Sequence, residues 1–371
     1  MRVAIVHDWL NQMGGAENVL IALKALFPEA PVYTSIYDRK AMPTLMARWT
    51  VHTSFMDRLP GIYRRHQLYL PLYPLAFEQF DFSEYDVVIS NKSGFCHGVI
   101  TPPSTVHICY CLTPTRFLWN TSQYLAREQV GGPTRRVLKP MLSWLRLWDQ
   151  VAAQRPDHFV SISRAVAQRV AKFYRRDSTI IYPPVDTRRF ETDAPPGDYD
   201  LIVSRLVPYK RIDLAVEAYT RLGRPLVIVG EGRDRPALEA IAGPNVRFVG
   251  RVSDEEVRRW VQGCRAFVFP GEEDFGIAPI EAQAAGRPVI AYAAGGALDT
   301  VIDGVTGLFF HEPSAEALAE AVHRLETIQF DPAVIREHAR QFDVTVFKEN
   351  FQRFVHQVTA GGPAVTVAAG G

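Results

Sequence analysis

The residues best suited to chemistry lie in one segment, 267–292 (FVFPGEEDFGIAPIEAQAAGRPVIAY). An apolar run that is typical of a buried strand ends there at a Pro-Gly break, and three acids and a glycine follow it: Glu272, Glu273, Asp274 and Gly276. A helix is expected over 278–285 and a second strand over 289–292, because a glycine and a proline lie between them. Unpaired backbone amides at the start of such a helix can hold an anion or a hydroxyl group. Acids that only complement the helix dipole would explain one carboxylate more easily than three, so the loop predicts a ligand site.

Two glutamates with seven residues between them, Glu273 and Glu281, flank Phe275 and Gly276. Together with the longer run EEDFGIAPIEAQAAGRPVIAYAAGGALDTVIDGVTG, this pattern resembles the signature of the retaining glycosyltransferase family 4. The run is most similar to the mannosyltransferase branch, which builds bacterial O-antigens and exopolysaccharides. The resemblance implies an α/β chain with the GT-B fold, in which two Rossmann-like doubly wound domains face a central cleft. It also implies transfer of a hexose from a nucleotide diphosphate sugar to a hydroxyl, with retained configuration.

Strand and helix patterns alternate in both halves of the chain, which favours parallel sheets covered on both faces. Ser163 and Ser253 are expected to cap helices in the two halves. Proline-rich breaks near residues 183 and 195 mark a domain boundary. The predicted parts are an acceptor-binding domain, a nucleotide-sugar-binding domain, a helix that crosses back to the first domain as in many GT-B proteins, and a mobile tail: residues 1–190, 191–343, 344–360 and 361–371.

A basic helix start follows the first strand of the second half, at 205–211 (RLVPYKR). Arginine and lysine beside the amides of a helix N-terminus can bind a pyrophosphate, although a solvated basic helix start is the plainer alternative. The resemblance assigns the donor phosphates to Arg205 and Lys210. These cations would stabilise the charge of the leaving nucleotide, together with the amides around Gly276 and Ile277.

Further donor contacts are implied by the resemblance. Family members carry a glycine loop near the donor phosphate and the acceptor, and Gly15, then Gly14, fits that place here. Glu273 would bind sugar hydroxyls near the reacting carbon, as the main catalytic carboxylate, and Glu281 would accept the ribose hydroxyls. The implied donor-binding set is Gly14, Gly15, Arg205, Lys210, Gly230, Arg251, Val252, Glu273, Phe275, Gly276, Ile277 and Glu281.

The segment 112–119 (LTPTRFLW) resembles one in the same branch where a histidine commonly precedes Thr-Pro. This chain has Leu112 at that position, and the family histidine is usually assigned a role beside the reacting sugar. Either the protein works without it, or His97 or His107 approaches from a neighbouring turn. A single histidine is more often a satisfied core residue than a catalytic one, and that alternative stays open.

Two residues are candidates for binding the acceptor. Asp8 follows the first strand and has a structural cap as its alternative role, whereas Arg116 could meet an acceptor phosphate or form only a surface ion pair. Basic and aromatic residues interleave in 55–80 and again in 135–148, which suits a membrane surface as well as an ordinary packed helix pair. With the family branch, these stretches suggest a polyprenyl-diphosphate-linked saccharide at the inner face of the bacterial plasma membrane, where a cytoplasmic protein would bind peripherally.

The composition excludes several classes. The chain has 371 residues, 47% of them apolar and 22% charged, with a formal net charge of +1, so nothing points to nucleic acid. No run is long enough to span a bilayer, the N-terminus is typical of a first strand rather than a signal peptide, and no C-x-x-C pair occurs. We expect neither a cofactor nor a metal, since the cations would replace magnesium and no Asp-x-Asp pair suits a metal. GDP-mannose is the favoured donor and a UDP-sugar is possible; a nucleotide-sugar epimerase and a non-catalytic sugar-nucleotide binding protein are the alternatives.

Overall fold

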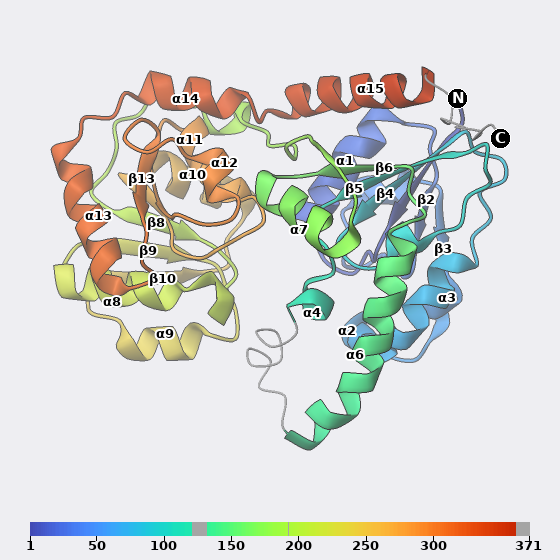
Figure 1. Ribbon diagram of the computed structural model, residues 1–371. Coiled ribbons are helices and arrows are strands. Elements are labelled where there is room, and N and C mark those ends of the chain that lie inside the picture. The colour runs from blue at the N-terminus through green and yellow to red at the C-terminus, as the bar shows by residue number, and fades with distance from the viewer. Residues whose placement is uncertain (121–131, 192, 361–371) are drawn as a thin grey trace, which may run out of the picture. The chain divides into compact units, whose positions relative to one another are not determined.

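The computed structural model describes residues 1–120, 132–191 and 193–360, with the backbone alone for 132–138. The chain forms two compact units, of which unit 1 contains Met1–Pro183 and the chain from Phe347 onward, and unit 2 contains Pro184–Val346. Each unit is a parallel sheet with helices on both faces (Figure 1). Two predictions lie wholly or partly outside the described residues: the mobile tail 361–371 and, for its side chains, the start of the internal stretch 135–148.

Unit 1 is built on a seven-stranded sheet in the order β3-β2-β1-β4-β5-β6-β7, with every pair parallel. Its strands are β1 (Val3–His7), β2 (Val32–Thr34), β3 (Val51–Thr53), β4 (Val87–Lys92), β5 (Val106–Cys111), β6 (His158–Ser161) and β7 (Thr179–Ile180). Its helices are α1 (Gly15–Leu26), α2 (Ile62–Arg65), α3 (Tyr73–Glu78), α4 (Arg116–Trp119), α6 (Gly132–Ala152), α7 (Arg164–Tyr174) and most of α15 (Val344–Ala360).

The central strands of unit 1 are buried on both faces. Residues of α3 and α6, such as Phe77 and Leu145, join a large apolar core on one face. On the other face, where α1 also lies, Tyr110 of β5 contacts Phe347 and Phe351 of α15 at 5.7 and 5.8 Å between ring centroids (Figure 1). Helix α15 therefore belongs to the core of unit 1.

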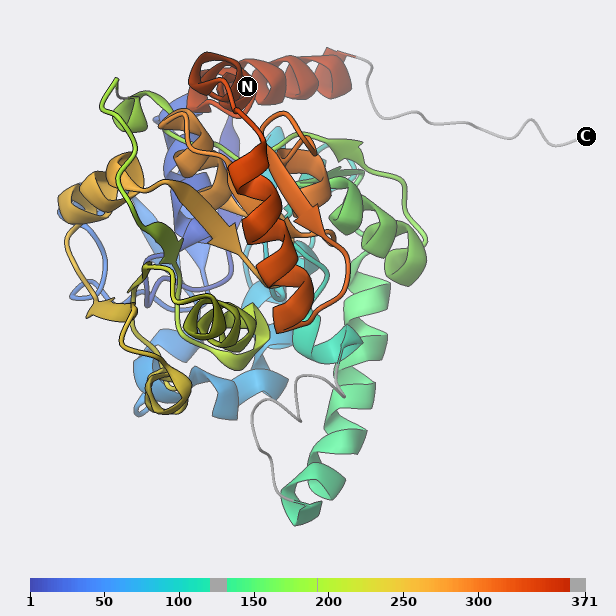
Figure 2. The same ribbon diagram turned by 90° about the vertical axis from the view of Figure 1, so that its left-hand side faces the viewer.

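Unit 2 is built on a six-stranded parallel sheet in the order β10-β9-β8-β11-β12-β13. Its strands are β8 (Asp200–Val203), β9 (Leu226–Val229), β10 (Val246–Gly250), β11 (Ala266–Phe269), β12 (Val289–Tyr292) and β13 (Gly307–Phe310). Its helices are α8 (Ile212–Leu222), α9 (Arg235–Ile241), α10 (Asp254–Gly263), α11 (Ile277–Ala284), α12 (Ala297–Thr300), α13 (Ala315–Thr327) and α14 (Pro332–Arg340). Helices α8 and α13 pack on one face of this sheet, and α10 and α11 cover the other (Figures 1 and 2).

Both sheets reverse their strand order beside the first strand of the unit. The reversal lies between β1 and β4 in unit 1 and between β8 and β11 in unit 2. Ligands of open α/β sheets bind outside the carboxyl ends of the strands at such a point. The fold therefore marks one position in each unit where a site is expected.

The predicted α/β architecture is confirmed, and most differences concern boundaries. Helix α11 begins and ends one residue earlier than the predicted 278–285. The side chains of Ser163 and Ser253 cap α7 and α10, and Ser253 forms a full capping box with Glu256. Within the described ranges, none of the helices combines the length and apolar character needed to cross a bilayer.

Candidate functional site

The reversal point of unit 2 holds a small pocket between the ends of β8 and β11. Ser204, Lys210, Phe269 and Glu273 are among the residues that line it. The loop after β11 can lie against the backbone of Lys210 because residue 271 is glycine: a Cβ there would come within 2.7 Å of the Lys210 carbonyl oxygen. The pocket thus brings together Lys210 and Glu273, which were both selected from the sequence and lie 63 residues apart along the chain.

Lys210 and Glu273 form an ion pair in this pocket, between the ammonium nitrogen and Oε1 of the carboxylate. Their side chains keep 15% and 17% of their surface exposed, so both remain reachable. Lys210 ends a short 3₁₀ turn and its ammonium also lies 5.2 Å from the centre of the Tyr209 ring. Adjacent positive and negative groups suit a ligand that carries both phosphates and hydroxyls, because each group finds its own partner on such a molecule.

The acidic loop is supported from behind by Gly295 and Gly296. The amide of Gly296 donates to the carbonyl oxygen of Glu273 at 2.8 Å. Gly295 has φ +61°, and a Cβ there would lie 2.2 Å from that same oxygen. A Cβ on Gly296 would meet the Phe275 backbone at 2.2 Å. Side chains are therefore excluded from this contact. The two glycines let their backbone lie directly against that of Glu273 and Phe275 and so fix the position of the acidic loop.

Helix α11 begins at the acidic loop and carries Glu281. Its N-cap is Gly276, with φ +97° and no capping side chain among the residues described here, so the first amides of the helix face outward. Glu281 is half-buried, and burial raises its pKa to about 7. Arg189 opposes this effect, whereas Asp254 and Asp186 add to it. The carboxyl group of Glu281 therefore changes its charge near neutral pH.

The remaining donor candidates of unit 2 lie on loops at the same edge of the sheet. Gly230, with φ +135°, packs so closely on the loop after β8 that a Cβ would lie 1.9 Å from the Ser204 carbonyl oxygen. Arg205 follows β8 and Arg251 follows β10; both are exposed, and Val252 is half-buried. Their functional roles remain predictions.

Asp8, at the reversal point of unit 1, has a structural role. Its carboxylate is 1% exposed and accepts hydrogen bonds from four consecutive backbone amides, Ser93 to Cys96, at 2.6 to 2.8 Å. The Ser93 hydroxyl donates a fifth at 3.1 Å. These bonds occupy both oxygens, so the structure favours the capping alternative over contact with an acceptor.

The two candidate histidines are buried in the core of unit 1, which favours the alternative of satisfied core residues over an approach to a sugar. His97 is fully buried, and its Nε2 donates to the carbonyl oxygen of Asp149 at 3.2 Å. His107 is equally buried, with Nε2 at 3.0 Å from the Ser90 hydroxyl. Burial lowers the pKa of both rings, that of His107 to about 3, so both are neutral at physiological pH. Leu112 is also buried, at 9% exposure.

The glycine loop of unit 1 precedes α1, with Gly14 at the N-cap. The buried Glu17 lies under it: a Cβ on Gly14 would be 3.2 Å from Glu17 Oε2. The other carboxylate oxygen of Glu17 is 3.3 Å from His7 Nε2, and Asn91 reaches both His7 Nδ1, at 3.2 Å, and the carbonyl oxygen of Ala16, at 2.8 Å. The loop with Gly14 and Gly15 therefore packs against a buried network of hydrogen-bonded polar side chains.

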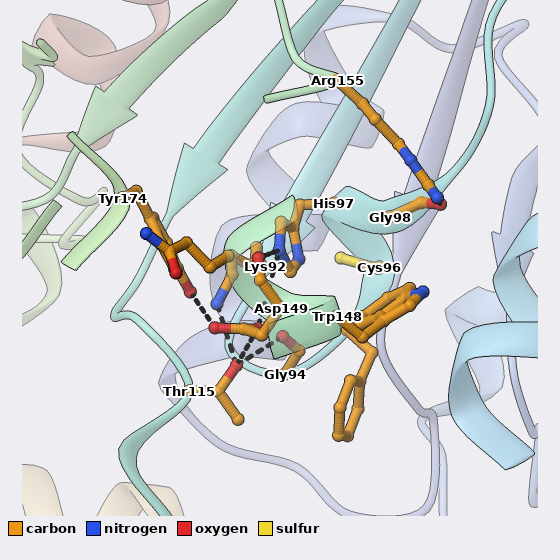
Figure 3. Close-up of polar contacts among 12 residues, drawn as sticks. Lys92, Gly94, Cys96, His97, Gly98, Thr115, Trp148, Asp149, Arg155 and Tyr174 are labelled. Atoms are coloured by element: carbon orange, nitrogen blue, oxygen red, sulfur yellow. Dashed lines mark hydrogen bonds and ion pairs between the residues drawn. The ribbon is translucent and has the colours of Figure 1, made fainter. Parts of the chain in front are cut away.

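Sequence reasoning missed a second buried polar cluster in unit 1, formed around Lys92 and Asp149 (Figure 3). Both side chains are fully buried, and they lie under the loop that carries Arg116. The one available signal was a lysine inside the apolar strand pattern VVISNK.

Across the described ranges, no group of three or more His, Cys, Asp and Glu residues is arranged to hold a metal ion.

Family comparisons match both halves of the chain. Residues 13–189 match the model described as Glycosyltransferase Family 4, and residues 186–342 match the model described as Glycosyl transferases group 1. An uncharacterized glycosyltransferase of Methanocaldococcus jannaschii is 25% identical over 204 residues, which are 53% of this chain and 57% of that protein. Glycogen synthase of Pseudomonas paraeruginosa is 34% identical over 158 residues, which are 40% of this chain and 30% of that protein. The matches thus span 57% and 30% of the lengths of these two relatives.

Solved structures share the fold over nearly the whole chain. Sucrose-phosphate synthase from Thermosynechococcus elongatus aligns with a TM-score of 0.71 and 18% identity, over 98% of this chain and all of that chain. HepE of Anabaena, solved in complex with UDP and glucose, aligns with a TM-score of 0.68 and 18% identity, over 96% and 99% of the two chains. These similarities confirm the GT-B fold.

Proposed function

Because the chain belongs to glycosyltransferase family 4, we propose that it transfers a hexose from a nucleotide diphosphate sugar to an acceptor hydroxyl with retained configuration. The observation that carries this proposal is the Lys210–Glu273 pair at the β8/β11 reversal point, beside the open N-terminus of α11. A cation, a carboxylate and outward-facing amides meet there at the position where α/β sheets bind ligands.

The chemistry requires stabilisation of two opposite charges. When the glycosidic bond to the diphosphate breaks, its electron pair leaves with the nucleotide and the anomeric carbon becomes cationic. Lys210, Arg205 and the first amides of α11 would stabilise the leaving diphosphate, and Glu273 would bind sugar hydroxyls close to the cationic carbon. The sugar nucleotide would replace the Lys210–Glu273 ion pair by giving the ammonium a phosphate and the carboxylate hydroxyls. Glu281 would accept the ribose hydroxyls in its ionised form.

We assign the donor to the nucleotide diphosphate sugars, with GDP-mannose favoured by the resemblance of the acidic segment. The HepE complexes with UDP support a UDP-sugar as the second candidate, although that similarity concerns the fold. The test is thermal unfolding of the protein with GDP, UDP, GDP-mannose, UDP-glucose and, as a control, NAD at millimolar levels. A ligand at 100 times its dissociation constant adds about 2.7 kcal/mol of stability. A response to guanine ligands alone supports GDP-mannose, a response to uridine ligands replaces it with a UDP-sugar, and no response contradicts the transferase.

The acceptor that we propose is a polyprenyl-diphosphate-linked saccharide, reached from the cytoplasmic face of the membrane. Support comes from exposed apolar side chains within the two basic-aromatic stretches: Leu68 is 73% exposed, Leu75 58%, Trp144 48% and Leu147 62%. Flotation with vesicles of anionic phospholipid tests the membrane contact. A double variant, Trp144→Ser with Leu147→Ser, should reduce the bound fraction, while Ile241→Ser, an exposed apolar residue of unit 2, should not. Equal binding of all three proteins would contradict this part of the proposal.

A further inference from the structure

The short helix α4 is held at both of its ends by one buried carboxylate. Asp149 Oδ1 accepts a hydrogen bond from the hydroxyl of Thr115, the N-cap residue of α4, at 2.8 Å. Asp149 Oδ2 accepts from the indole nitrogen of Trp119, the last residue of α4, at 2.7 Å. The hydroxyl of Tyr174 on α7 donates to the same Oδ2 at 2.8 Å (Figure 3). The Tyr174 ring also lies edge-on to Trp119, with 6.0 Å between the ring centroids.

Lys92 supplies the opposite charge under the same loop. Its ammonium donates to the Thr113 carbonyl oxygen and to the Thr115 hydroxyl oxygen, both at 3.2 Å. The Thr115 hydroxyl therefore lies between the ammonium and the carboxylate, as Figure 3 shows. Burial is the largest single effect and lowers the pKa of Lys92, but Asp149, Cys111, Cys109 and Asp8 together outweigh it and leave the pKa above its ordinary value. Lys92 is charged at every physiological pH.

Helix α4 needs an external support because it has only four residues. A helix of this length is unstable by itself, since nucleation is not repaid by further hydrogen bonds. The Thr115 side chain does not cap it either: its oxygen contacts Gly94, Lys92 and Asp149 instead. Buried ion pairs add little to stability compared with apolar residues of the same volume. The opposite charges of Lys92 and Asp149, which meet through the Thr115 hydroxyl, therefore have a more evident role in fixing the place of α4 than in stabilising the core.

We propose that Asp149, together with Lys92 and Thr115, positions α4 so that its first residue, Arg116, binds the diphosphate of the acceptor. This inference rests on the proposed transfer to a lipid-linked diphosphate. It places Asp149, Lys92 and Thr115 in a positioning role, and Arg116 alone in contact with the acceptor. The half-buried side chain of Arg116 starts the turn that Asp149 holds, at the carboxyl edge of the sheet of unit 1.

The test uses matched variants of the full chain. Thr115→Val removes the hydroxyl at nearly constant volume, and Thr115→Ser restores it. Asp149→Asn alters the carboxylate that bonds to Thr115 and Trp119 of the α4 turn. Tyr174→Phe removes the hydrogen bond to the Asp149 carboxylate whose donor lies on α7 instead. The first measurement is hydrogen exchange of the α4 amides. We expect exchange of Leu118, Trp119 and Asn120 to accelerate about tenfold in Thr115→Val and Asp149→Asn, and to stay near wild type in Thr115→Ser and Tyr174→Phe.

The second measurement is the affinity for farnesyl diphosphate at millimolar UDP or GDP, which keeps the donor phosphate site filled. Thr115→Val and Asp149→Asn should weaken it about tenfold, Arg116→Ala at least as much, and the two controls should match the wild type. Equal hydrogen exchange in all variants would contradict the claim that Asp149 and Thr115 hold α4 in place. Selective exchange with unchanged affinity, or a wild type that does not bind farnesyl diphosphate, would overturn the acceptor role. Failure of the transferase proposal is separate, because it would show as a missing nucleotide response in thermal unfolding.

Discussion

Replacing Glu281 with glutamine is expected to stabilise the protein at alkaline pH and to weaken nucleotide binding. The reason is that the surroundings of Glu281 raise its pKa in the folded protein from 4.5 to about 7. A carboxyl group with a raised pKa binds more protons in the folded than in the unfolded state between these two values. Stability is therefore lost as the pH rises from about 4.5 to 7, and the loss is complete above pH 7.

The size of this effect follows from the two pKa values. A shift of one pKa unit corresponds to about 1.4 kcal/mol. The difference between the two pKa values therefore lowers the free energy of unfolding by about 3 kcal/mol at pH 8. Glutamine has nearly the same shape and carries no charge, so Glu281→Gln avoids this loss. The difference in free energy of unfolding between Glu281→Gln and the wild type should grow by about 2–3 kcal/mol in favour of the variant between pH 5 and pH 8. A carboxylate that binds ribose hydroxyls forms stronger hydrogen bonds than an amide, so nucleotide affinity should fall by about tenfold or more.

The assay is guanidinium unfolding of the wild type and Glu281→Gln at pH 5 and pH 8, with calorimetric titration of the responding nucleotide at pH 8. Glu320→Gln, on the exposed side of α13 in the same unit, is the control and should follow the wild type in both. The wild type should also bind nucleotide more tightly as the pH rises through 7. If Glu281→Gln gains nothing between pH 5 and pH 8, the carboxyl group is not desolvated. If its nucleotide affinity is unchanged, Glu281 does not contact the nucleotide.

Three further predictions concern the transfer reaction and the acidic loop. Glu273→Ala should lower turnover about 100-fold or more, whereas Leu112→Ala should have a much smaller effect; equal, mild losses in a transfer assay would remove Glu273 from the site. Activity should persist after treatment with EDTA, and complete loss that added magnesium reverses would contradict metal-independent transfer. Gly295→Ala should lower turnover at least about tenfold, whereas Gly304→Ala, which has a similar positive φ of +75° but nothing within 4 Å of an added Cβ, should lower stability by about 1 kcal/mol and leave turnover near wild type.

The sequence was sufficient for the architecture because its local signals agree with the fold. Alternating apolar runs and helix patterns predicted parallel sheets, and Ser163 and Ser253 marked two helix starts correctly. The Pro-Gly break and the acids located the loop between β11 and α11 to within a residue. These features depend on neighbours along the chain, which is why a single sequence reveals them.

Contacts between distant segments were beyond the sequence. The amides that bind Asp8 lie 85 to 88 residues away, and Asp149 is 34 residues from Thr115. His107 gave no sign that its ring faces the core rather than solvent, because every residue of β5 after Val106 is buried and the strand has no polar face. The support of Glu273 by Gly295 was equally hidden, since it involves a backbone oxygen and a missing side chain.

The two reversal points have the same strand order, yet their polar residues are used differently. In unit 1, His7, Asn91 and Lys92 at the ends of β1 and β4 are buried and bonded to other protein groups. In unit 2, Lys210 and Glu273 remain partly exposed beside the corresponding strands. A polar group that is buried against a protein partner contributes by holding that partner in place, because a ligand cannot reach it. Ligand binding by unit 1 is therefore expected to depend on the loops beyond its strands, such as 112–119, and hence on the buried charges that hold those loops.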